Sequence, residues 1–259
     1  MMTEHLKHWD IKWEVDDFQI SRTIDFYDQH RHNVFVRARE RRNIQKIGLD
    51  FSKDFVWKSL VSCLLTTQQR SGPTSNIARL LRMAPFPLTL QFCIDNFAQL
   101  DIVALNVLSN FGGIRRTSII AQQLKDNLQS IIASDWFILK EITHQEISVD
   151  GKVWEQSLAN AVQKHVNGFG PKQSRNFLQI LGVTKYEIPL DSRIMDWLNQ
   201  NNFPIHLTAT GLSDPFYYKF ISDGIQYLCE QANIYPCLLD AAIFSSYDNG
   251  KWTEENFVL

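Results

Sequence analysis

The sequence predicts a mainly α-helical protein with two lobes. Apolar residues recur every three or four positions through most of the chain, which is the spacing of an amphipathic helix. Strand-like patterns are confined to HNVFVRA at 32–38 and ITHQEISV at 142–149, and no repeat or flexible linker interrupts the chain. Without a linker, any two lobes must pack compactly against each other, and both ends of the chain could contribute to one of them.

The first half of the chain contains three clear helical patterns. In segment 53–70, KDFVWKSLVSCLLTTQQR, the apolar residues fall on a single stripe. Ser71-Gly72-Pro73 breaks that helix, and Pro73 suits the first turn of the next one, which we expect to end before Pro85. A further helix is expected over 116–128, after a Phe-Gly-Gly turn.

The second half continues the helical pattern. A helix is expected over 151–166, and another after a Gly-x-Gly turn, running through Leu181 with Gly182 as its terminator. Asp191 stands at or near the cap of the next helix, DSRIMDWLNQ. Ser213-Asp214-Pro215 opens a long aromatic helix.

Composition indicates a folded intracellular protein. Of the 259 residues, 44% are hydrophobic and 12% aromatic, which is enough to bury a substantial core. No run approaches the ~20 consecutive apolar residues of a membrane-spanning helix, and the polar start MMTEHLKHWD lacks the apolar segment of a signal peptide. We expect a protein of the cytoplasm and nucleoid, or of the nucleus in a eukaryote.

Charge and cysteine usage exclude some classes of site. The formal net charge of −2 argues against a uniformly basic protein, although a local basic surface is enough to dock a DNA duplex. Segment Val36–Lys46 carries five cations and one acid; we interpret it as a solvated face, with DNA docking as the alternative. The dispersed cysteines form no CxxC pair, which disfavours structural zinc and an iron–sulfur cluster and indicates core residues. They are Cys63, Cys93, Cys229 and Cys237.

The stretch NGFGPKQSR, residues 167–175, predicts a helix–hairpin–helix. Gly168 and Gly170 allow a tight turn that leaves backbone N–H groups uncovered. Together with the free N–H groups of the new helix, these amides would form an anion site that reads the nucleic-acid backbone without reading its sequence. A plain connection between two helices, with glycine needed only for closure, is the alternative.

Lys172 and Asp191 are the candidate catalytic residues. Lys172 falls in the first turn of the predicted helix, where the helix dipole and partial burial favour the neutral amine that can attack carbon. Asp191 follows nineteen residues later. A helix of about eleven residues spans ~16 Å, and the roughly eight residues after it can span that distance back, so the two side chains could meet. The plainer interpretations are a phosphate contact for Lys172 and a helix cap for Asp191.

The motifs GFGPK (168–172) and PLDSR (189–193) resemble those of the helix–hairpin–helix DNA glycosylase superfamily, also called HhH-GPD. The resemblance covers about residues 51–200. In the members that also cleave the DNA backbone, a lysine stands two positions after the hairpin, as Lys172 does, and an aspartate lies nearly a helix and a loop later, as Asp191 does. The resemblance implies that both act in a cleft between two helical lobes. These would be a helical barrel-type domain over residues 52–183, which ends in the helix–hairpin–helix, and a discontinuous helical lobe made of residues 1–51 and 184–259.

The same resemblance implies contacts with DNA. The segment FVWKSLVSCLLTTQQ resembles an early family helix, after which a polar residue fills the gap left by the extruded base; Gln68 matches it best. The segment GGIRRTSIIAQQL resembles a central helix whose arginine-rich start lies near DNA. The residues expected to contact DNA are Gln68, Arg115, Arg116, Gly168, Phe169 and Gly170. The aromatic residues available to stack on a base are Phe169, Phe177, Trp252 and Phe257, although aromatic residues at helical spacing more often belong to the core.

A lysine and an aspartate without the four-cysteine cluster of the endonuclease III branch resemble the 8-oxoguanine glycosylases. The resemblance implies that the damaged nucleotide leaves double-stranded DNA, that neutral Lys172 attacks C1′ while Asp191 stabilises the cationic sugar, and that β-elimination cleaves the strand. It implies no metal or organic cofactor, and we expect a monomer.

Other functions remain open from the residues alone. A monofunctional glycosylase for another damaged base would use Asp191 to activate water and Lys172 only to bind phosphate. A non-catalytic DNA-binding protein would use the hairpin as a clamp on the DNA backbone. An α-helical interaction protein with accidental motif matches is the third alternative.

Overall fold

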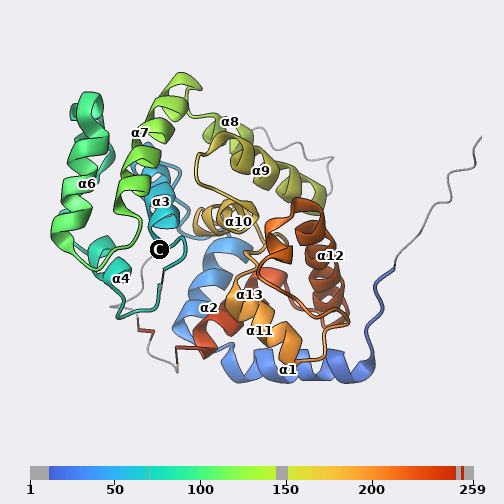
Figure 1. Ribbon diagram of the computed structural model, residues 1–259. Coiled ribbons are helices and arrows are strands. Elements are labelled where there is room, and N and C mark those ends of the chain that lie inside the picture. Colours follow the sequence, from blue (N-terminus) through green and yellow to red (C-terminus); the bar gives the residue numbers. More distant parts are fainter. Residues whose placement is uncertain (1–11, 70, 144–150, 249–251, 254–259) are drawn as a thin grey trace, which may run out of the picture.

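Helices form the framework of the molecule. The computed structural model describes residues 12–69, 71–143, 151–248 and 252–253. Within these ranges there are thirteen α-helices and no strand (Figure 1). None of the described helices is long and apolar enough to span a membrane. The prediction of a mainly α-helical, two-lobed protein is confirmed.

Every helix expected from the sequence is present, although the one expected over 53–70 ends at Leu65, and six further α-helices were not predicted. The helices of the first half are α1 (Asp17–His30), α2 (Val34–Arg39), the π-helical turn η1 (Glu40–Ile44), α3 (Lys53–Leu65), α4 (Asn76–Leu81), α5 (Leu90–Asp95), the 3-10 turn η2 (Phe97–Gln99), α6 (Leu100–Phe111) and α7 (Thr117–Ala133). Those of the second half are α8 (Phe137–Thr143), α9 (Gly151–His165), α10 (Pro171–Ile180), α11 (Ser192–Gln200), the 3-10 turn η3 (Gly211–Ser213), α12 (Pro215–Gln231) and α13 (Pro236–Ser246).

Side-chain caps determine where several helices begin. Asp214 starts α12 as expected, because its Oδ1 accepts a hydrogen bond from the Tyr217 N–H at 2.8 Å. Ser75 starts α4 in the same way, with its Oγ accepting from the Ala78 N–H at 3.1 Å. Pro73 therefore lies in the turn before α4 and not in its first turn, where the sequence placed it.

The prediction of a strand at 32–38 is wrong, because these residues form the cap and most of helix α2. Asn33 caps α2, and its Oδ1 accepts from the Phe35 N–H at 2.8 Å. The apolar residues of α2 then pack against α13, and this burial outweighs their preference for strands. The other expected strand, 142–149, lies mostly outside the described residues, and its first two residues end α8.

The molecule has two large apolar cores, and the chain passes from the first to the second shortly after residue 183. The first contains buried residues from Val56 to Val183, on α3 to α10. The second contains buried residues from Ile188 to Ile243, and Trp13 and Phe26 from the N-terminal region pack against it. This is the arrangement expected of a lobe built from both ends of the chain. The domain limits at 51/52 and 183/184 stay a prediction.

The basic segment Val36–Lys46 is only partly the solvated face that we expected. Arg37, Arg41 and Lys46 are exposed. Arg39, however, is buried, and its Nη1 lies 3.2 Å from Oδ2 of Asp240 on α13. A buried arginine is retained only where its charge is paired, so this residue joins α2 to α13 inside the second lobe.

The end of the same segment fastens this lobe to the C-terminal end of α10. Asn43 is buried, and its Nδ2 donates to the carbonyl oxygens of Gln179 at 3.1 Å and Thr184 at 2.7 Å. Lys46 donates from Nζ to the carbonyl oxygen of Gly182 at 2.8 Å. Carbonyl groups at a helix C-terminus lack partners within the helix and attract donors and cations. These contacts fix the helix that begins with Pro171 and Lys172.

Candidate active site

The hairpin between α9 and α10 requires glycine at position 168. Gly168 has a φ of +89°, and a Cβ there would collide with the Gln123 side chain of α7. Asn127, also on α7, holds the turn: its Nδ2 donates to the Asn167 carbonyl at 2.9 Å, and its Oδ1 accepts from the Asn167 N–H at 2.7 Å. Sequence reasoning missed Asn127, although a polar residue beside Leu128 on an apolar stripe was a usable signal.

Gly170 leaves the outer side of the hairpin open. It precedes Pro171 at the start of α10, and nothing lies within 4 Å of the position that a Cβ would take. In the described part of the chain, the N–H groups of Gly168 and Gly170 have no hydrogen-bond acceptor. These amides and those of the first turn of α10 suit an anion such as a phosphate.

Asp191 caps α11, as the sequence predicted. Its Oδ1 accepts from the N–H groups of Arg193 at 2.9 Å and Ile194 at 3.1 Å. Its Oδ2 lies 3.7 Å from Nη1 of Arg193, and the side chain is 17% exposed. Because two amides hold Oδ1, Oδ2 is the oxygen left to act on another group.

Lys172 and Asp191 line the same cavity, which has a volume of about 90 Å³. Lys172 is the second residue of α10 and Asp191 caps α11, so both stand at helix N-termini. Residues of α3 and α4, from the first lobe, and of α2 and α13, from the second, complete the walls. The cavity therefore lies between the lobes. The catalytic roles of both residues stay a prediction.

The buried thiol of Cys63 on α3 is another potential nucleophile near Lys172. Asn176, one turn after Lys172, places its Nδ2 3.5 Å from the Cys63 Sγ. Burial raises the pKa of the Cys63 thiol, and the nearby Lys172 charge opposes this effect. A thiol that stays protonated is a poor nucleophile. Lys172 is therefore the better candidate in this cavity.

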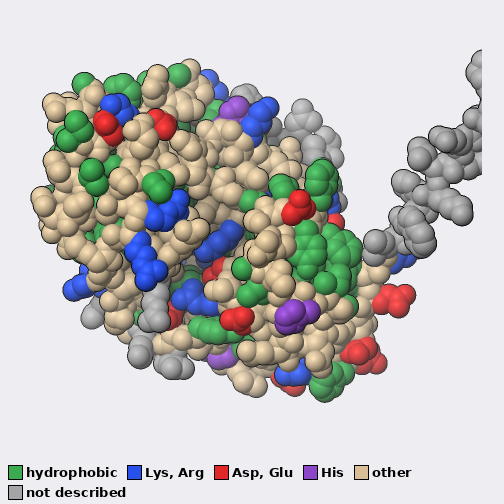
Figure 2. Space-filling model, in the orientation of Figure 1, with side chains coloured by type: hydrophobic (Ala, Val, Ile, Leu, Met, Phe, Trp, Pro, Cys, Tyr) green, Lys and Arg blue, Asp and Glu red, His purple; other side chains and the backbone are tan. Residues whose placement is uncertain are grey.

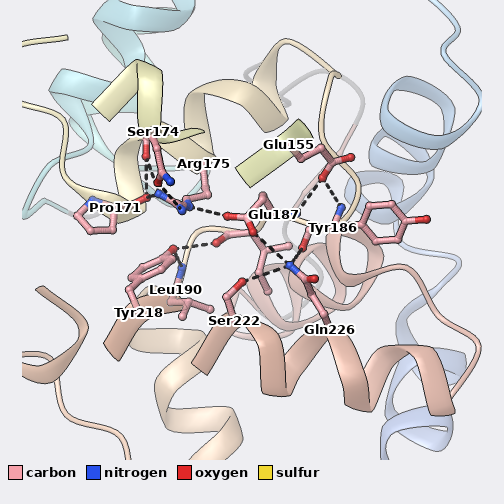
Figure 3. A network of polar contacts seen from close by, with 12 residues as sticks. Glu155, Pro171, Ser174, Arg175, Tyr186, Glu187, Leu190, Tyr218, Ser222 and Gln226 are labelled. Carbon is pink, nitrogen blue, oxygen red and sulfur yellow. Dashed lines mark hydrogen bonds and ion pairs between the residues drawn. The ribbon is translucent and has the colours of Figure 1, made fainter. Parts of the chain in front are cut away.

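A buried ion pair holds the chain that leads to Asp191 (Figure 3). Nε of Arg175, on α10, donates to Oε2 of Glu187 at 2.8 Å, and the two side chains are 4% and 1% exposed. The other carboxylate oxygen of Glu187 accepts from Nε2 of Gln226 on α12 at 3.2 Å. The Lys172 helix and the Asp191 segment are therefore joined directly through charged hydrogen bonds, which are stronger than neutral ones.

Two further side chains fix the backbone of the same segment (Figure 3). The Tyr218 hydroxyl donates to the Ile188 carbonyl at 2.8 Å and accepts from the Leu190 N–H at 2.7 Å. Glu155 on α9 accepts three backbone N–H bonds of 2.7–2.9 Å, from Lys185, Tyr186 and Glu187. Burial raises the pKa of Glu155 to about 7, although these three bonds favour its ionised form. Sequence reasoning missed this whole network, because its members are separated along the chain.

Aromatic side chains from the second lobe line the cavity. Phe35 and Phe244 stack with ring centroids 4.8 Å apart, and Trp252 lies 5.4 Å and 5.7 Å from them. Arg193, next to Asp191, lies over the Phe244 ring at 4.2 Å. Trp252 was among the aromatic residues expected to be available to a base, and it does reach the cavity.

Phe169 and Phe177 are core residues. Both are buried in the first core, with ring centroids 5.8 Å apart. The Phe169 side chain therefore cannot stack on DNA, and only its backbone remains for a DNA contact. Its burial anchors the hairpin between the two glycines. Phe257 lies outside the described residues.

Gln68 is exposed in the loop after α3 and has a φ of +57°, which is unusual for a residue other than glycine. Its neighbour Gln69 donates from Nε2 to the Arg115 carbonyl at 3.2 Å and accepts from the Arg115 N–H at 2.7 Å. Gln173 of α10 donates to Thr67 Oγ1 at 2.8 Å. The loop is thus held between the α6–α7 loop and the helix that carries Lys172. Gln69 and Gln173 were not predicted.

Arg115 and Arg116 lie in the loop before α7. Arg115 is exposed, while Arg116 is partly exposed and has a φ of +60°. On the face of the molecule drawn in Figure 2, Lys and Arg side chains surround a hollow in the middle, over the region of α3, α4 and α10. A local cationic surface is therefore present despite the net charge of −2. Contact of these arginines with DNA stays a prediction.

No protein-family model matches the sequence, and no curated protein matches it. The fold, in contrast, is similar to those of solved 8-oxoguanine DNA glycosylases. That of Methanocaldococcus jannaschii is 18% identical with a TM-score of 0.64, covering 89% of this chain and 94% of that one. That of Thermotoga maritima is 14% identical with a TM-score of 0.63, covering 88% and 96%.

A third similar structure contains DNA. It is the M. jannaschii 8-oxoguanine glycosylase/lyase in complex with a 15mer DNA containing 8-oxoguanine. It is 17% identical, with a TM-score of 0.63 over 92% of this chain and 99% of that one. At such identities the similarity shows the fold, and the expected mainly helical, two-lobed fold is confirmed.

Proposed function

We propose that the protein is a DNA glycosylase with AP lyase activity that removes 8-oxoguanine from double-stranded DNA. The observation that carries this proposal is the position of Lys172 and Asp191 on one cavity between the lobes, beside a hairpin with uncovered amides. The solved structures with a similar fold are 8-oxoguanine DNA glycosylases, and this supports 8-oxoguanine as the base that is removed.

In the proposed reaction, the damaged nucleotide leaves the duplex, because C1′ is not accessible within it. The amides of the hairpin hold a phosphate, and Gln68 occupies the gap in the base stack. Arg115 and Arg116 neutralise further phosphates. These contacts offset the cost of unstacking, which is a few kcal/mol.

The chemical step joins Lys172 to the sugar. The neutral amine forms a bond to C1′ as the bond between C1′ and the base breaks, and the base leaves with the electron pair. The Asp191 carboxylate, through Oδ2, stabilises the positive charge that develops on the sugar. Opening of the sugar ring, in which O4′ takes a proton from water, gives a protonated Schiff base. This electron sink permits loss of a C2′ proton to water and then β-elimination, in which the 3′ phosphate leaves with the electron pair of its bond to C3′.

Borohydride trapping tests the proposal. Wild-type protein, incubated with a duplex containing 8-oxoguanine, should give a covalent adduct, and Lys172→Gln should give none. Lys164→Gln, at an exposed lysine near the end of α9, is the matched control and should still be trapped. Release of the base without a trapped adduct in wild type would favour the monofunctional reaction. Binding without base release on a panel of lesions would favour the DNA clamp.

A further inference from the structure

Three polar side chains on the cavity wall have no part in the reaction at C1′. They are Arg39 of α2, Gln179 of α10 and Asp240 of α13, which are 5%, 0% and 5% exposed. Nη1 of Arg39 donates to Asp240 Oδ2 at 3.2 Å and also to Gln179 Oε1. We call these residues the polar cluster. None of them belongs to the motifs around Lys172 and Asp191.

Two donors of the polar cluster lack acceptors. Across the described ranges of the chain, Arg39 Nε and Gln179 Nε2 are buried and make no well-formed hydrogen bond, although the Gln179 side chain lies close enough to Asp240 to help lower the pKa of that carboxyl. Buried polar groups nearly always have partners, because an unpaired one keeps the full cost of leaving water. Both residues line the cavity, so a ligand inside it can supply the missing acceptors.

Asp240 adds an acceptor beside these donors. Arg39 engages its Oδ2, and a carboxylate keeps further acceptor sites on both oxygens. Burial raises the pKa of Asp240 to about 6, while the Arg39 charge opposes this rise. Above that pH the carboxylate is ionised and can only accept. The cavity therefore presents an acceptor and two donors on one wall.

The aromatic wall of the same cavity determines the shape of the ligand. Phe244 and Trp252 both line it, and aromatic side chains suit contact with a flat heteroaromatic ring. A base is flat and carries its hydrogen-bonding groups only at its edges. A base held against these rings can turn one edge towards the polar cluster.

We propose that the polar cluster selects the base, with Asp240 accepting from N1–H and the 2-amino group of a 2-amino-6-oxopurine and Gln179 Nε2 donating to its O6. This inference rests on the proposed function. Guanine and its oxidised form carry two adjacent donors beside an acceptor on their pairing edge. Adenine and the pyrimidines do not carry two adjacent donors beside an acceptor. Each of them would therefore leave a donor or acceptor of the polar cluster unpaired, or would place donor against donor or acceptor against acceptor.

Binding to matched duplexes tests the role of Asp240. In Lys172→Gln protein, which cannot form the covalent adduct, we expect 8-oxoguanine to bind at least about tenfold more tightly than 8-oxohypoxanthine, which lacks the 2-amino group. Adding Asp240→Asn should reduce this preference to about twofold or less, because an amide NH₂ replaces one acceptor oxygen. The ratio within each variant is the measurement, so a general loss of affinity does not affect it.

Asp240→Asn also leaves the buried Arg39 charge less well paired and can unfold the protein. Gln179→Met keeps the ion pair and removes only the amide. It should lower, without abolishing, the preference for 8-oxoguanine over 8-oxo-2-aminopurine, which lacks both O6 and the N1 proton that Asp240 would accept. Gln122→Met on the exposed side of α7 is the matched control and should keep the wild-type preference. A cooperative thermal transition shows that each variant is folded.

Equal binding of 8-oxoguanine and 8-oxohypoxanthine by Lys172→Gln protein would overturn the inference. An unchanged preference in folded Gln179→Met would do the same. In both cases the proposed function stands if wild type still excises 8-oxoguanine. If wild type excises no base at all, the proposed function fails first and the inference falls with it.

Discussion

Gln173 and Thr67 join the Lys172 helix to the loop that presents Gln68. Nε2 of Gln173 donates to Oγ1 of Thr67 at 2.8 Å, and Gln173 is only 4% exposed. Gln173 immediately follows Lys172, and Thr67 immediately precedes Gln68. The candidate nucleophile and the residue expected to replace the extruded base are therefore fixed relative to each other.

Loss of this contact should slow base excision more than it slows cleavage at a ready-made abasic site. In Gln173→Leu, the loop with Gln68 loses its tie to α10, while Lys172 keeps its place on the helix. We expect excision in single-turnover assays to fall by about tenfold, the size of one hydrogen bond's contribution. Equal losses on both substrates would instead indicate that Gln173 acts through Lys172.

The two hairpin glycines should respond differently to alanine. Gly168→Ala forces a side chain into the Gln123 side chain at a φ of +89° and should destabilise the fold by more than about 1 kcal/mol. Gly170→Ala meets no neighbour, so the fold should keep its stability, but the new methyl group stands where a phosphate would approach. Urea unfolding and the affinity for undamaged duplex are the measurements. Unchanged affinity in Gly170→Ala would contradict the assignment of the hairpin as the phosphate site.

The centre of the site could be predicted because its signals are local. The glycines, Lys172 and Asp191 lie within one continuous stretch, and a single helix with a short return determines how near the two reactive side chains can be. The cap at Asp191 depends only on its own helix. For such features, residue type and spacing contain most of the necessary information.

The walls of the site depend on contacts between distant residues, and these could not be predicted. Arg39 belongs to a segment with the pattern of a solvated face, and it is buried because it pairs with Asp240, 201 positions later. The strand expected around Phe35 fails for the same reason, because α13 provides the surface on which a helix is buried. Propensity is a weak guide where long-range packing decides the outcome.

Asparagine at position 191 should separate catalysis from folding. Asn caps helices about as well as Asp, so Asp191→Asn should retain a folded α11 but lose the negative charge facing the sugar. We expect base excision to fall by about 100-fold or more, as for other losses of transition-state electrostatic stabilisation. Asp191→Ala should also lose about 1 kcal/mol of stability through the missing cap. Full activity in Asp191→Asn would favour a non-catalytic role for this residue.

Glu155 should make the stability of the fold depend on pH. Burial raises its pKa to about 7 in the folded protein, above the ordinary value of 4.5, so the folded state holds this proton more tightly than the unfolded state. The stabilisation from the proton is complete below about pH 4.5 and is lost as pH rises through about 7.

Comparison with Glu155→Gln isolates this effect, because glutamine does not titrate. Between pH 5 and 8, the free energy of unfolding of wild type should fall relative to that of the variant by on the order of 2 kcal/mol. Asp240 titrates in both proteins, so its contribution cancels in the difference. Urea unfolding at several pH values measures it. A difference that stays constant, or that grows in favour of wild type with rising pH, would mean that the three backbone N–H groups keep Glu155 ionised throughout.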